Sequence, residues 1–429
     1  MRERIAIIDG IRTPIAKAGG KFKGIQAENL GAHVVQEIAL RVGIELDRYD
    51  EIIIGNVSQP SHAANVARVI ALKAGFPEHV PAYTVHRNCA SGMESITTAA
   101  NKILAGEGEI FLAGGVESMS NVPLLFSPAM TGVFEGLFKA RSLTDKIKNL
   151  AHFRPSFLKP IVGLMQGLTD PTSGLMMGST AEVLAQDFGI SREEQDEYAS
   201  KSHNKAEAAQ KKGVFAEEIA PLIYNPLKGL IMEHDDGIRY DQSPDKLAKL
   251  KPFFDRKNGT VTAGNASQIS DAGAAVVLMS ESKAKEMGLE PLGFLKAYAY
   301  EGLDPIRMGL GPVYATSKVF QLTGLSMKDI DVIEMNEAFA VQVLSNLRAF
   351  ESVEYAKKHL NRSTAVGAID TNILNINGGA VALGHPVGMT GTRIVIHTLK
   401  ELRRQNKQRG LATLCIGGGQ GASFILEVE

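Results

Sequence analysis

The sequence is poor in cysteine and contains no tryptophan: of its 429 residues, only Cys89 and Cys415 are cysteines. Two cysteines cannot build the disulfide framework of a small secreted protein, and neither lies in a CxxC or Cys/His pattern that would bind a metal. We therefore expect no metal site. Residues 1–5 lead directly into a predicted strand and leave no room for a signal peptide, so the expected location is the cytoplasm.

An excess of charge of one sign and long apolar runs are also lacking. The 46 Lys and Arg residues nearly balance the 47 Asp and Glu residues, and the net charge is -1. An electrostatic nucleic-acid binder is therefore not expected. No run approaches the roughly 18 apolar residues of a membrane-spanning helix. The chain is too long for one ordinary hydrophobic core, so we expect two or three packed units.

Strand-like and helical segments alternate at both ends of the chain. The N-terminal part contains predicted strands 5–8, 51–54, 82–85 and 110–113 and helices 27–42, 65–74 and 92–104. The C-terminal part contains predicted strands 273–279, 292–299, 332–335, 374–376, 411–414 and 423–428 and helices 313–322, 336–350 and 390–405. This alternation predicts an α/β protein in which one sheet-and-helix unit occurs twice.

The middle of the chain lacks the strand pattern. We predict an inserted helical and loop domain at residues 121–251, between an N-terminal half (1–120 plus 252–284) and a C-terminal half (285–429). Ser191 and Glu194 have the spacing of a capping box, which predicts the start of a helix. Residues 121–176 mix apolar side chains with six Lys or Arg. Such helices either contact a membrane or a partner, or pack on their own domain.

Cys89 lies in a turn between the predicted strand 82–85 and the helix that begins near Gly92. Unpaired N–H groups and the helix dipole favour an anion at a helix start. They would lower the pKa of the Cys89 thiol below its free value of about 8.5. The alternative is a small buried residue in a tight turn.

Three further polar residues follow predicted strands or glycine-rich turns in the C-terminal part. His385 lies in Gly384-His385-Pro386, Cys415 precedes three glycines, and Asn336 follows strand 332–335. Because ligand sites of such sheets form beyond the strand C-termini, we expect these residues and Cys89 near one cleft. The histidine can accept a thiol proton or donate to an oxyanion. Taken singly, His385 could merely stabilise its loop and Asn336 could be a helix cap.

Together these motifs resemble those of the thiolases, the coenzyme A-dependent acyltransferases, along essentially the whole chain. The resemblance is carried by Asn88-Cys89-Ala90-Ser91-Gly92, Gly114-Gly115-Val116-Glu117-Ser118-Met119-Ser120, Ala263-Gly264-Asn265-Ala266-Ser267, Asn336-Glu337-Ala338-Phe339-Ala340, Gly384-His385-Pro386 and Cys415-Ile416-Gly417-Gly418-Gly419. It implies a thiolase fold with duplicated βαβαβαββ halves in five αβαβα layers. It also implies a homodimer or homotetramer, no permanently bound cofactor, and coenzyme A as co-substrate.

The resemblance also implies a role for each candidate residue. Cys89 would be the nucleophile that carries the acyl group, and His385 the base that activates it and a donor to the thioester oxygen. Asn336 would hold a water at that oxygen, and Cys415 would act as acid and base at the α-carbon. The backbone amides of Cys89 and Gly417 would form a second oxyanion hole. The expected substrate and coenzyme A contacts are Ser267, Gly264, Asn265, Met177 and Phe339.

The implied activity is cleavage of 3-ketoacyl-CoA by coenzyme A, giving acetyl-CoA and a shortened acyl-CoA. One alternative is an acetyltransferase restricted to acetoacetyl-CoA. A decarboxylating synthase would need a second histidine in place of Cys415, and a non-catalytic lipid carrier or assembly subunit would not need both cysteines.

The length of segment 121–176 resembles the β subunits of fatty-acid-oxidation complexes, which implies an acyl-CoA hydratase/dehydrogenase α subunit or a membrane as partner. Asn336 departs from that group, which often has histidine there. Met176 stands where many short-chain thiolases have a histidine that contacts coenzyme A. The sequence therefore leaves the acyl chain length open.

Overall fold

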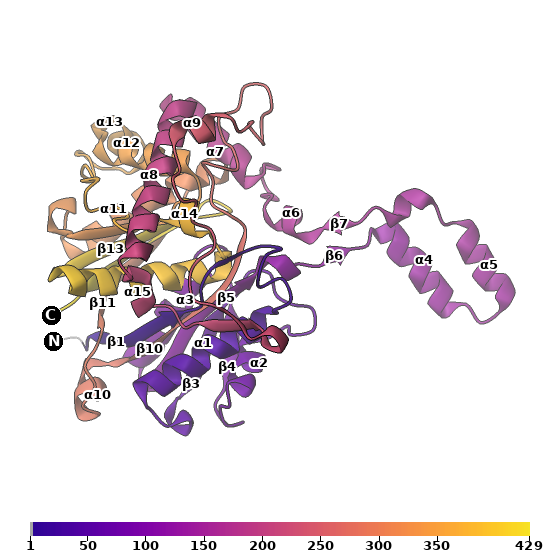
Figure 1. Ribbon diagram of the computed structural model, residues 1–429, viewed down its shortest axis with the longest axis horizontal. Helices are drawn as coiled ribbons and strands as arrows, with labels where there is room; N and C mark the ends of the chain where they lie inside the picture. The colour runs from indigo at the N-terminus through magenta and orange to yellow at the C-terminus, as the bar shows by residue number, and fades with distance from the viewer. Residues whose placement is uncertain (1–2) are drawn as a thin grey trace.

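The computed structural model describes residues 3–429 and arranges them in five layers (Figure 1). Two pairs of helices form the outer layers, and a third pair lies between the two halves of a sheet. The outer pairs are α1 (Ala27–Val42) with α2 (Val66–Lys73) and α11 (Gly311–Thr323) with α12 (Ala340–Glu351); the central pair is α3 (Ser91–Ala105) and α15 (Val387–Gln405). The predicted αβαβα layering is confirmed. Met1 and Arg2, part of the segment on which the signal-peptide expectation rests, lie outside the described residues.

Ten strands of the described residues join in one sheet of order β12-β13-β14-β11-β1-β10-β5-β3-β4, with β2 paired to β10 beside this path. Its N-terminal half contains β1 (Ile5–Arg12), β3 (Glu51–Gly55), β4 (Ala82–Val85), β5 (Ile110–Ser118) and β10 (Ser270–Ser280), with the short β2 (Ala16–Lys17) paired to β10. Its C-terminal half contains β11 (Gly293–Gly302), β12 (Val332–Met335), β13 (Arg409–Ile416) and β14 (Gln420–Glu427). The halves meet where β1 and β11 pair antiparallel, from Ile5–Leu295 to Ile7–Gly293.

Both halves of the sheet contain parallel strands that are joined by helices, which is the repeated unit that the sequence predicts. Strands β3, β4 and β5 are parallel to one another, as are β12 and β13, and parallel neighbours need a long connection, here a helix. Helices then cover both faces of each half-sheet, which explains the fully apolar run Ile52-Ile53-Ile54 in β3.

Glycines allow the two central helices to approach closely. A Cβ atom at Gly92 of α3 would lie 2.8 Å from the backbone nitrogen of Thr392, and one at Gly391 of α15 would lie 2.6 Å from that of Met93. The Thr392 hydroxyl donates to the Gly92 carbonyl at 3.1 Å. Because Cys89 directly precedes α3 and His385 directly precedes α15, this packing brings both turns to the same end of the central layer.

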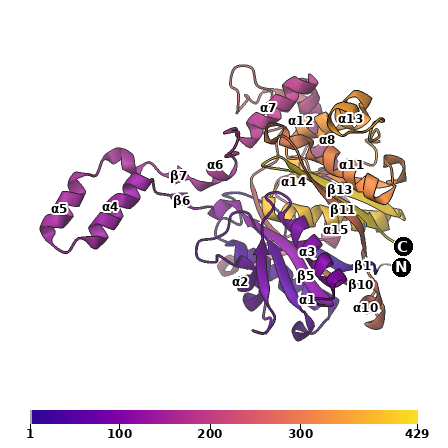
Figure 2. The ribbon, with the colours of Figure 1, turned by 180° about the vertical axis from the view of Figure 1, so that it is seen from behind.

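Between β5 and β10 the chain leaves the sheet. It forms β6 (Leu124–Leu125), α4 (Pro128–Lys139), α5 (Leu143–Ala151), β7 (Ile161–Val162), α6 (Gly163–Gly167), α7 (Met177–Phe188), α8 (Arg192–Lys211), β8 (Leu222–Asn225), β9 (Leu230–Met232) and α9 (Pro244–Ala248). Residues 124–162, which we call the arm, project away from the body and carry α4 and α5 at the far end (Figures 1 and 2).

The arm packs little against the rest of the protein. Within residues 3–429, the buried apolar clusters that form the core include no arm residue. Phe138 in α4 is 93% exposed and Leu143 in α5 is 74% exposed. Eight more large apolar side chains of the arm are exposed: Leu124, Leu125, Phe126, Phe134, Ile147, Leu150, Leu158 and Val162. The alternative that these helices pack on the core of their own domain is therefore wrong.

Three details of the predicted elements need correction. The predicted strand 374–376 is reduced to a single bridge between Leu374 and Ile333, because Asn375 has a left-handed φ of 43° that ends the extended run. The helix predicted from Asn336 starts only at Ala340, so Asn336 is not its cap. The insertion contains two short hairpins, β6–β7 and β8–β9, whose strands are too short to produce a sequence pattern.

The predicted capping box agrees with the structure, because Ser191 and Glu194 form it at the start of α8. Short helices α10 (Glu281–Glu286), α13 (Val353–His359) and α14 (Ala380–Leu383) complete the connections. Among the helices of residues 3–429, none has the length and apolar character needed to cross a bilayer.

Candidate active site

Cys89 lies in a tight turn between β4 and α3, directly before the helix cap Ala90. The preceding residue, Asn88, has a left-handed φ of 44°, and its side-chain amide donates to the Gly417 carbonyl at 2.7 Å. That bond ties the Cys89 turn to the glycine turn that follows β13. Cys89 and Gly417 line the same cavity, which has a volume of about 350 Å³.

The Cys89 thiol has the opposite pKa shift from the one predicted. Burial raises its pKa and outweighs the backbone N–H groups of Gly417 and Cys89, which donate to the sulfur and lower it. The helix start therefore does not produce a free thiolate in the resting protein. Amides that interact with this sulfur could also donate to an oxygen that becomes negative beside it, as in an oxyanion hole.

His385 is buried, and its hydrogen bonds define its tautomer. The Thr390 hydroxyl donates its proton to the Pro386 carbonyl at 2.9 Å and lies 2.7 Å from His385 Nδ1. Since Thr390 has no second proton, Nδ1 carries the hydrogen and the lone pair of Nε2 can accept a hydrogen bond or a proton. Burial, followed by the charge of Arg393, lowers the pKa of His385 to about 3. The ring is therefore neutral at pH 7 and can accept a proton at Nε2.

Asn336 lies beside this lone pair. Its Nδ2 is 3.4 Å from His385 Nε2, and its backbone N–H donates to the Thr413 carbonyl at 2.9 Å. The Oδ1 atom is buried and accepts no hydrogen bond from residues 3–429. A buried amide oxygen without a donor is costly, so this atom is available to a bound molecule.

Cys415 is the second-last residue of β13 and is 2% exposed. Burial raises the pKa of its thiol, and the charge of Cys89 raises it further. Cys415 is therefore protonated at neutral pH. The turn after it requires glycine, because Gly418 and Gly419 have φ values of 87° and 79°.

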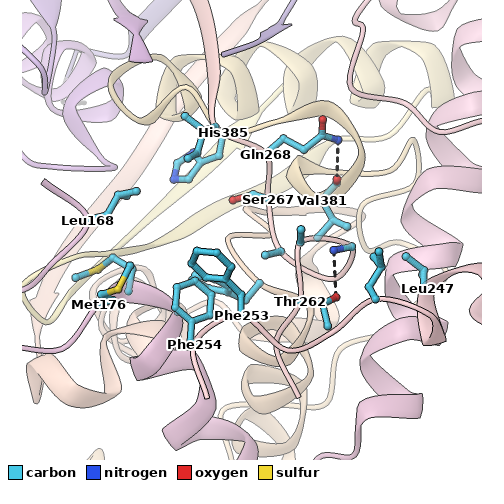
Figure 3. A pocket seen from close by; sticks show the side chains of 18 of the residues that line it. Leu168, Met176, Leu247, Phe253, Phe254, Thr262, Ser267, Gln268, Val381 and His385 are labelled. Atoms are coloured by element: carbon cyan, nitrogen blue, oxygen red, sulfur yellow. Dashed lines mark hydrogen bonds between the residues drawn. The ribbon is translucent and has the colours of Figure 1, made fainter. Parts of the chain in front are cut away.

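A second, larger pocket of about 720 Å³ opens on His385 (Figure 3). The predicted contacts Gly264, Ser267, Met177 and Phe339 all line it. The two cavities share four lining residues, Met119, Leu168, Met177 and Val387, so they meet between His385 and Cys89. The structure thus brings Cys89, Gly417 and His385 to the walls of two cavities that join. Asn336 beside His385 and Cys415 in β13 are buried and line neither cavity.

Asn265 is the exception among the predicted contacts. It is fully buried and does not line either cavity. Its amide donates to Asp196 at 2.9 Å and to the Thr260 carbonyl at 3.0 Å, and its oxygen accepts from the Thr262 N–H at 2.8 Å. Asn265 therefore supports the loop that carries Gly264 and does not face a ligand.

Several residues of the site have no distinctive sequence signal. Arg239, Lys246 and His203 line the larger pocket, as does Met176. The Nδ1 atom of His203 accepts from the Arg239 N–H at 3.1 Å. Burial lowers the pKa of His203 to about 4, so the ring is neutral at pH 7 and its Nε2 carries a hydrogen that it can donate. A histidine within a charged helix and an arginine in a loop look like ordinary surface residues in a sequence.

Two family models match nearly the whole chain. The model described as "Thiolase, N-terminal domain" matches residues 5–282, and "Thiolase, C-terminal domain" matches residues 289–428. The chain belongs to the thiolase family. The predicted family and α/β thiolase fold are therefore confirmed.

Relatives of this thiolase chain carry closely related names. The 3-ketoacyl-CoA thiolases of Yersinia enterocolitica and Yersinia pestis are 40% and 41% identical to it, over 100% of this chain and 97% of theirs. Among solved structures, the acetyl-CoA acetyltransferase of Bacillus anthracis has a TM-score of 0.87 and 38% identity over 99% of each chain. Human mitochondrial 3-ketoacyl-CoA thiolase, solved in complex with CoA, has a TM-score of 0.85 and 34% identity over 100% of this chain and 98% of its own.

We expect alkylation of Cys89 by iodoacetamide to be slow at pH 7 and to accelerate about tenfold per pH unit up to pH 9. The raised pKa keeps the thiol protonated at neutral pH, and only the thiolate reacts. Mass spectrometry of the labelled peptide would give the rate, with Cys89→Ser as control. A rate that is already constant at pH 7 would contradict the raised pKa.

Proposed function

We propose that the protein is a 3-ketoacyl-CoA thiolase that transfers the acyl group of its substrate to coenzyme A through a Cys89 thioester. The observation that carries this proposal is that the Cys89 thiol and the Gly417 turn line one cavity, the neutral His385 lines a second cavity that meets it, and the second thiol, Cys415, is buried two residues before Gly417. The names of the Yersinia and human relatives support it.

In the first half-reaction, His385 Nε2 takes the Cys89 proton and the thiolate attacks the 3-keto carbon. The amides of Cys89 and Gly417 donate to the oxygen that becomes negative. The bond between C2 and C3 then breaks, and the electron pair forms the enolate of acetyl-CoA. A water held by Asn336 Oδ1, together with protonated His385, stabilises that enolate oxygen. Cys415 gives its proton to C2, which suits a thiol whose pKa is raised.

In the second half-reaction, coenzyme A collects the acyl group. Cys415 now accepts the thiol proton of coenzyme A, whose sulfur attacks the Cys89 thioester. The tetrahedral intermediate collapses and releases Cys89 as the leaving thiolate, which recovers a proton from His385. The larger pocket, with Ser267 and Gly264 in its wall, is the proposed site of the pantetheine chain, and Arg239 and Lys246 supply positive charge for its phosphates. Coenzyme A is thus a substrate, and this scheme requires no bound cofactor.

One alternative is supported by a specific observation. The solved acetyl-CoA acetyltransferase of Bacillus anthracis resembles this chain as closely as the human thiolase does. An acetyltransferase would need room for a two-carbon acyl group only. The 350 Å³ cavity at Cys89 favours a longer acyl chain. A non-catalytic lipid carrier or assembly subunit would be favoured by the loss of one of the two cysteines, and both are present.

The remaining sequence-based expectations stay predictions. One is the division of the chain into an N-terminal half (1–120 plus 252–284), an inserted domain (121–251) and a C-terminal half (285–429). The others are the homodimer or homotetramer and the cytoplasmic location.

Thiolysis of 3-ketoacyl-CoA substrates from four to sixteen carbons tests the proposed function. We expect activity that persists or rises with chain length, and its loss in Cys89→Ala, because that variant cannot form the thioester. The reaction is followed by loss of the 3-ketoacyl-CoA absorbance. Activity confined to acetoacetyl-CoA would favour the acetyltransferase, and inactivity of the folded wild-type protein on all substrates would contradict both enzymes.

The cavity at Cys89 makes a more specific prediction. Gly167 at the end of α6 lines it, and a Cβ atom at Gly167 would meet no atom within 4 Å. The change Gly167→Leu should fill the cavity without disturbing the fold. We expect kcat/KM to fall about tenfold or more for long substrates and to change little for acetoacetyl-CoA.

Gly132→Leu is the matched control, since Gly132 in the arm is equally free of neighbours but lines neither cavity. Equal losses on short and long substrates in Gly167→Leu would show that this cavity does not hold the acyl tail.

We propose further that the arm is a docking surface. Residues 126–160 contain six Lys or Arg and two Asp or Glu residues, a net charge of +4 in a chain whose total is -1. Leu143, Ile147 and Leu150 recur at helical spacing in α5 and are exposed together. An exposed apolar stripe flanked by lysines suits an anionic membrane surface. A hydratase/dehydrogenase α subunit is the other partner expected from the resemblance.

Deletion of the arm tip tests this proposal without unfolding the body. Leu125 pairs with Ile161, so an Asn-Gly turn can replace residues 126–160. We expect unchanged acetoacetyl-CoA thiolysis and thermal midpoint, with loss of sedimentation with anionic phospholipid vesicles. Neutral vesicles serve as control. Retained vesicle binding would contradict the proposal, and loss of co-purification with an α subunit alone would assign the arm to that partner.

A further inference from the structure

Two buried carboxylates next to the site are not used in the reaction scheme. Glu117 in β5 is 0% exposed and Glu337, directly after Asn336, is 1% exposed. Each accepts four hydrogen bonds, and all eight donors are uncharged groups. Burying a carboxylate without a cation in contact costs more stability than burying an apolar residue. A role in positioning would explain why both are retained.

Glu117 binds the segment that follows His385. Its Oε2 accepts from the Gly388 N–H at 2.9 Å and from the Val57 N–H at 3.1 Å. Its Oε1 accepts from the Ser58 N–H at 2.9 Å and from the Asn56 amide at 3.2 Å. Gly388 lies in the first turn of α15, so the carboxylate fixes the start of the helix that His385 precedes.

Glu337 binds the segment before His385. Its Oε2 accepts from the Val381 N–H at 3.1 Å and from the Ser202 hydroxyl at 2.7 Å. Its Oε1 accepts from the Tyr198 hydroxyl at 2.9 Å and from the Asn375 amide at 3.0 Å. Val381 lies in α14, four residues before His385. The carboxylate thus anchors the opposite end of the His385 segment to α8 and to the residues after β12.

Glycines permit both approaches. A Cβ atom at Gly388 would lie 2.7 Å from Glu117 Oε2, and one at Gly379 would lie 2.4 Å from Glu337 Cδ. The segment 381–388 is therefore fixed at both ends, once by each half of the fold. Between the two anchors, Gly384 has a φ of 107°, a conformation that a residue with a side chain would rarely adopt.

We propose that Glu117 and Glu337 are positioning residues that hold the two ends of segment 381–388 so that His385 Nε2 stays aimed at the junction of the cavities. The proposal rests on the proposed thiolase function, in which His385 activates Cys89. It assigns neither carboxylate a contact with substrate.

The charge of Glu117 acts on Cys89 in the direction opposite to a loss of activity. Burial raises the pKa of Glu117 to about 7, and its charge contributes to the raised pKa of Cys89. Removal of that charge would therefore lower the pKa of Cys89 and increase the thiolate, so this effect on Cys89 would not explain a lower kcat in Glu117→Gln.

Glu117→Gln and Glu337→Gln test the proposal, since each puts an amide donor where the N–H donors now converge. We expect kcat for thiolysis to fall about 10–100-fold, the range typical of partners that orient a functional group, with KM values within about threefold of wild type. Asp50→Asn is the matched control, because Asp50 accepts from the Glu109 and Ile110 N–H groups at the far end of β5. It should leave kcat unchanged.

A double-mutant cycle with His385→Ala separates positioning from general damage. If the carboxylates act through His385, Glu117→Gln or Glu337→Gln should cause no further loss in the His385→Ala background. An equal further loss, a change in KM alone, or a kcat within threefold of wild type would overturn the proposal. Glu117→Asp and Glu337→Asp, which keep the charge but shorten the reach, replace any Gln variant that does not fold. An inactive wild-type protein would instead contradict the proposed function.

Discussion

The close approach of α3 and α15 is the contact on which the rest of the site depends. Each helix begins directly after a residue of the site, and only glycine at positions 92 and 391 lets the two backbones come this near. A Cβ atom at either position would meet backbone, which cannot rotate away as a side chain can. The helices would have to separate, and the Cys89 turn would separate from His385 with them. The central layer therefore sets the catalytic distance before any catalytic side chain is considered.

Burial determines the protonation state of each group at this junction. It disfavours charge on every ionisable side chain, so His385 remains a free base while Cys89 and Cys415 remain thiols. His385, Cys89 and Cys415 are therefore uncharged in the resting site. This explains why the expectation of a lowered Cys89 pKa was wrong: the helix start contributes, but desolvation of the thiolate is larger.

The sequence predicts the parts of this protein that depend on particular residue types in a local pattern. It misses the parts that depend on where tertiary packing places an ordinary residue. Four residues of the site could be found because each lies near a predicted strand end or in a glycine-rich turn: Cys89, His385, Asn336 and Cys415. The layers could be predicted because strands and helices alternate in both halves of the chain. Asn265 was misjudged because its neighbours face the pocket while its own amide turns inward to Asp196. His203 and Arg239 enter the pocket from α8 and a distant loop, which only tertiary packing brings together. The projection of the arm was equally unpredictable, since exposure depends on what a helix packs against.

Duplication explains how one fold gives two cysteines different tasks. Cys89 precedes a helix and opens on a cavity, with backbone amides directed at its sulfur, so it can react and have its adduct stabilised. Cys415 is the second-last residue of β13 and is followed by a glycine turn, so it is enclosed, and the backbone N–H that lowers the pKa of its thiol is its own. The two halves likewise contribute one carboxylate each to the His385 segment, Glu117 from the first and Glu337 from the second. The two cysteines do not follow equivalent strands: Cys89 follows β4 and precedes α3, as His385 precedes α15, whereas Cys415 lies in β13, which takes the place of β5 in the sheet order. Their different positions in the two repeats therefore give the two thiols different surroundings.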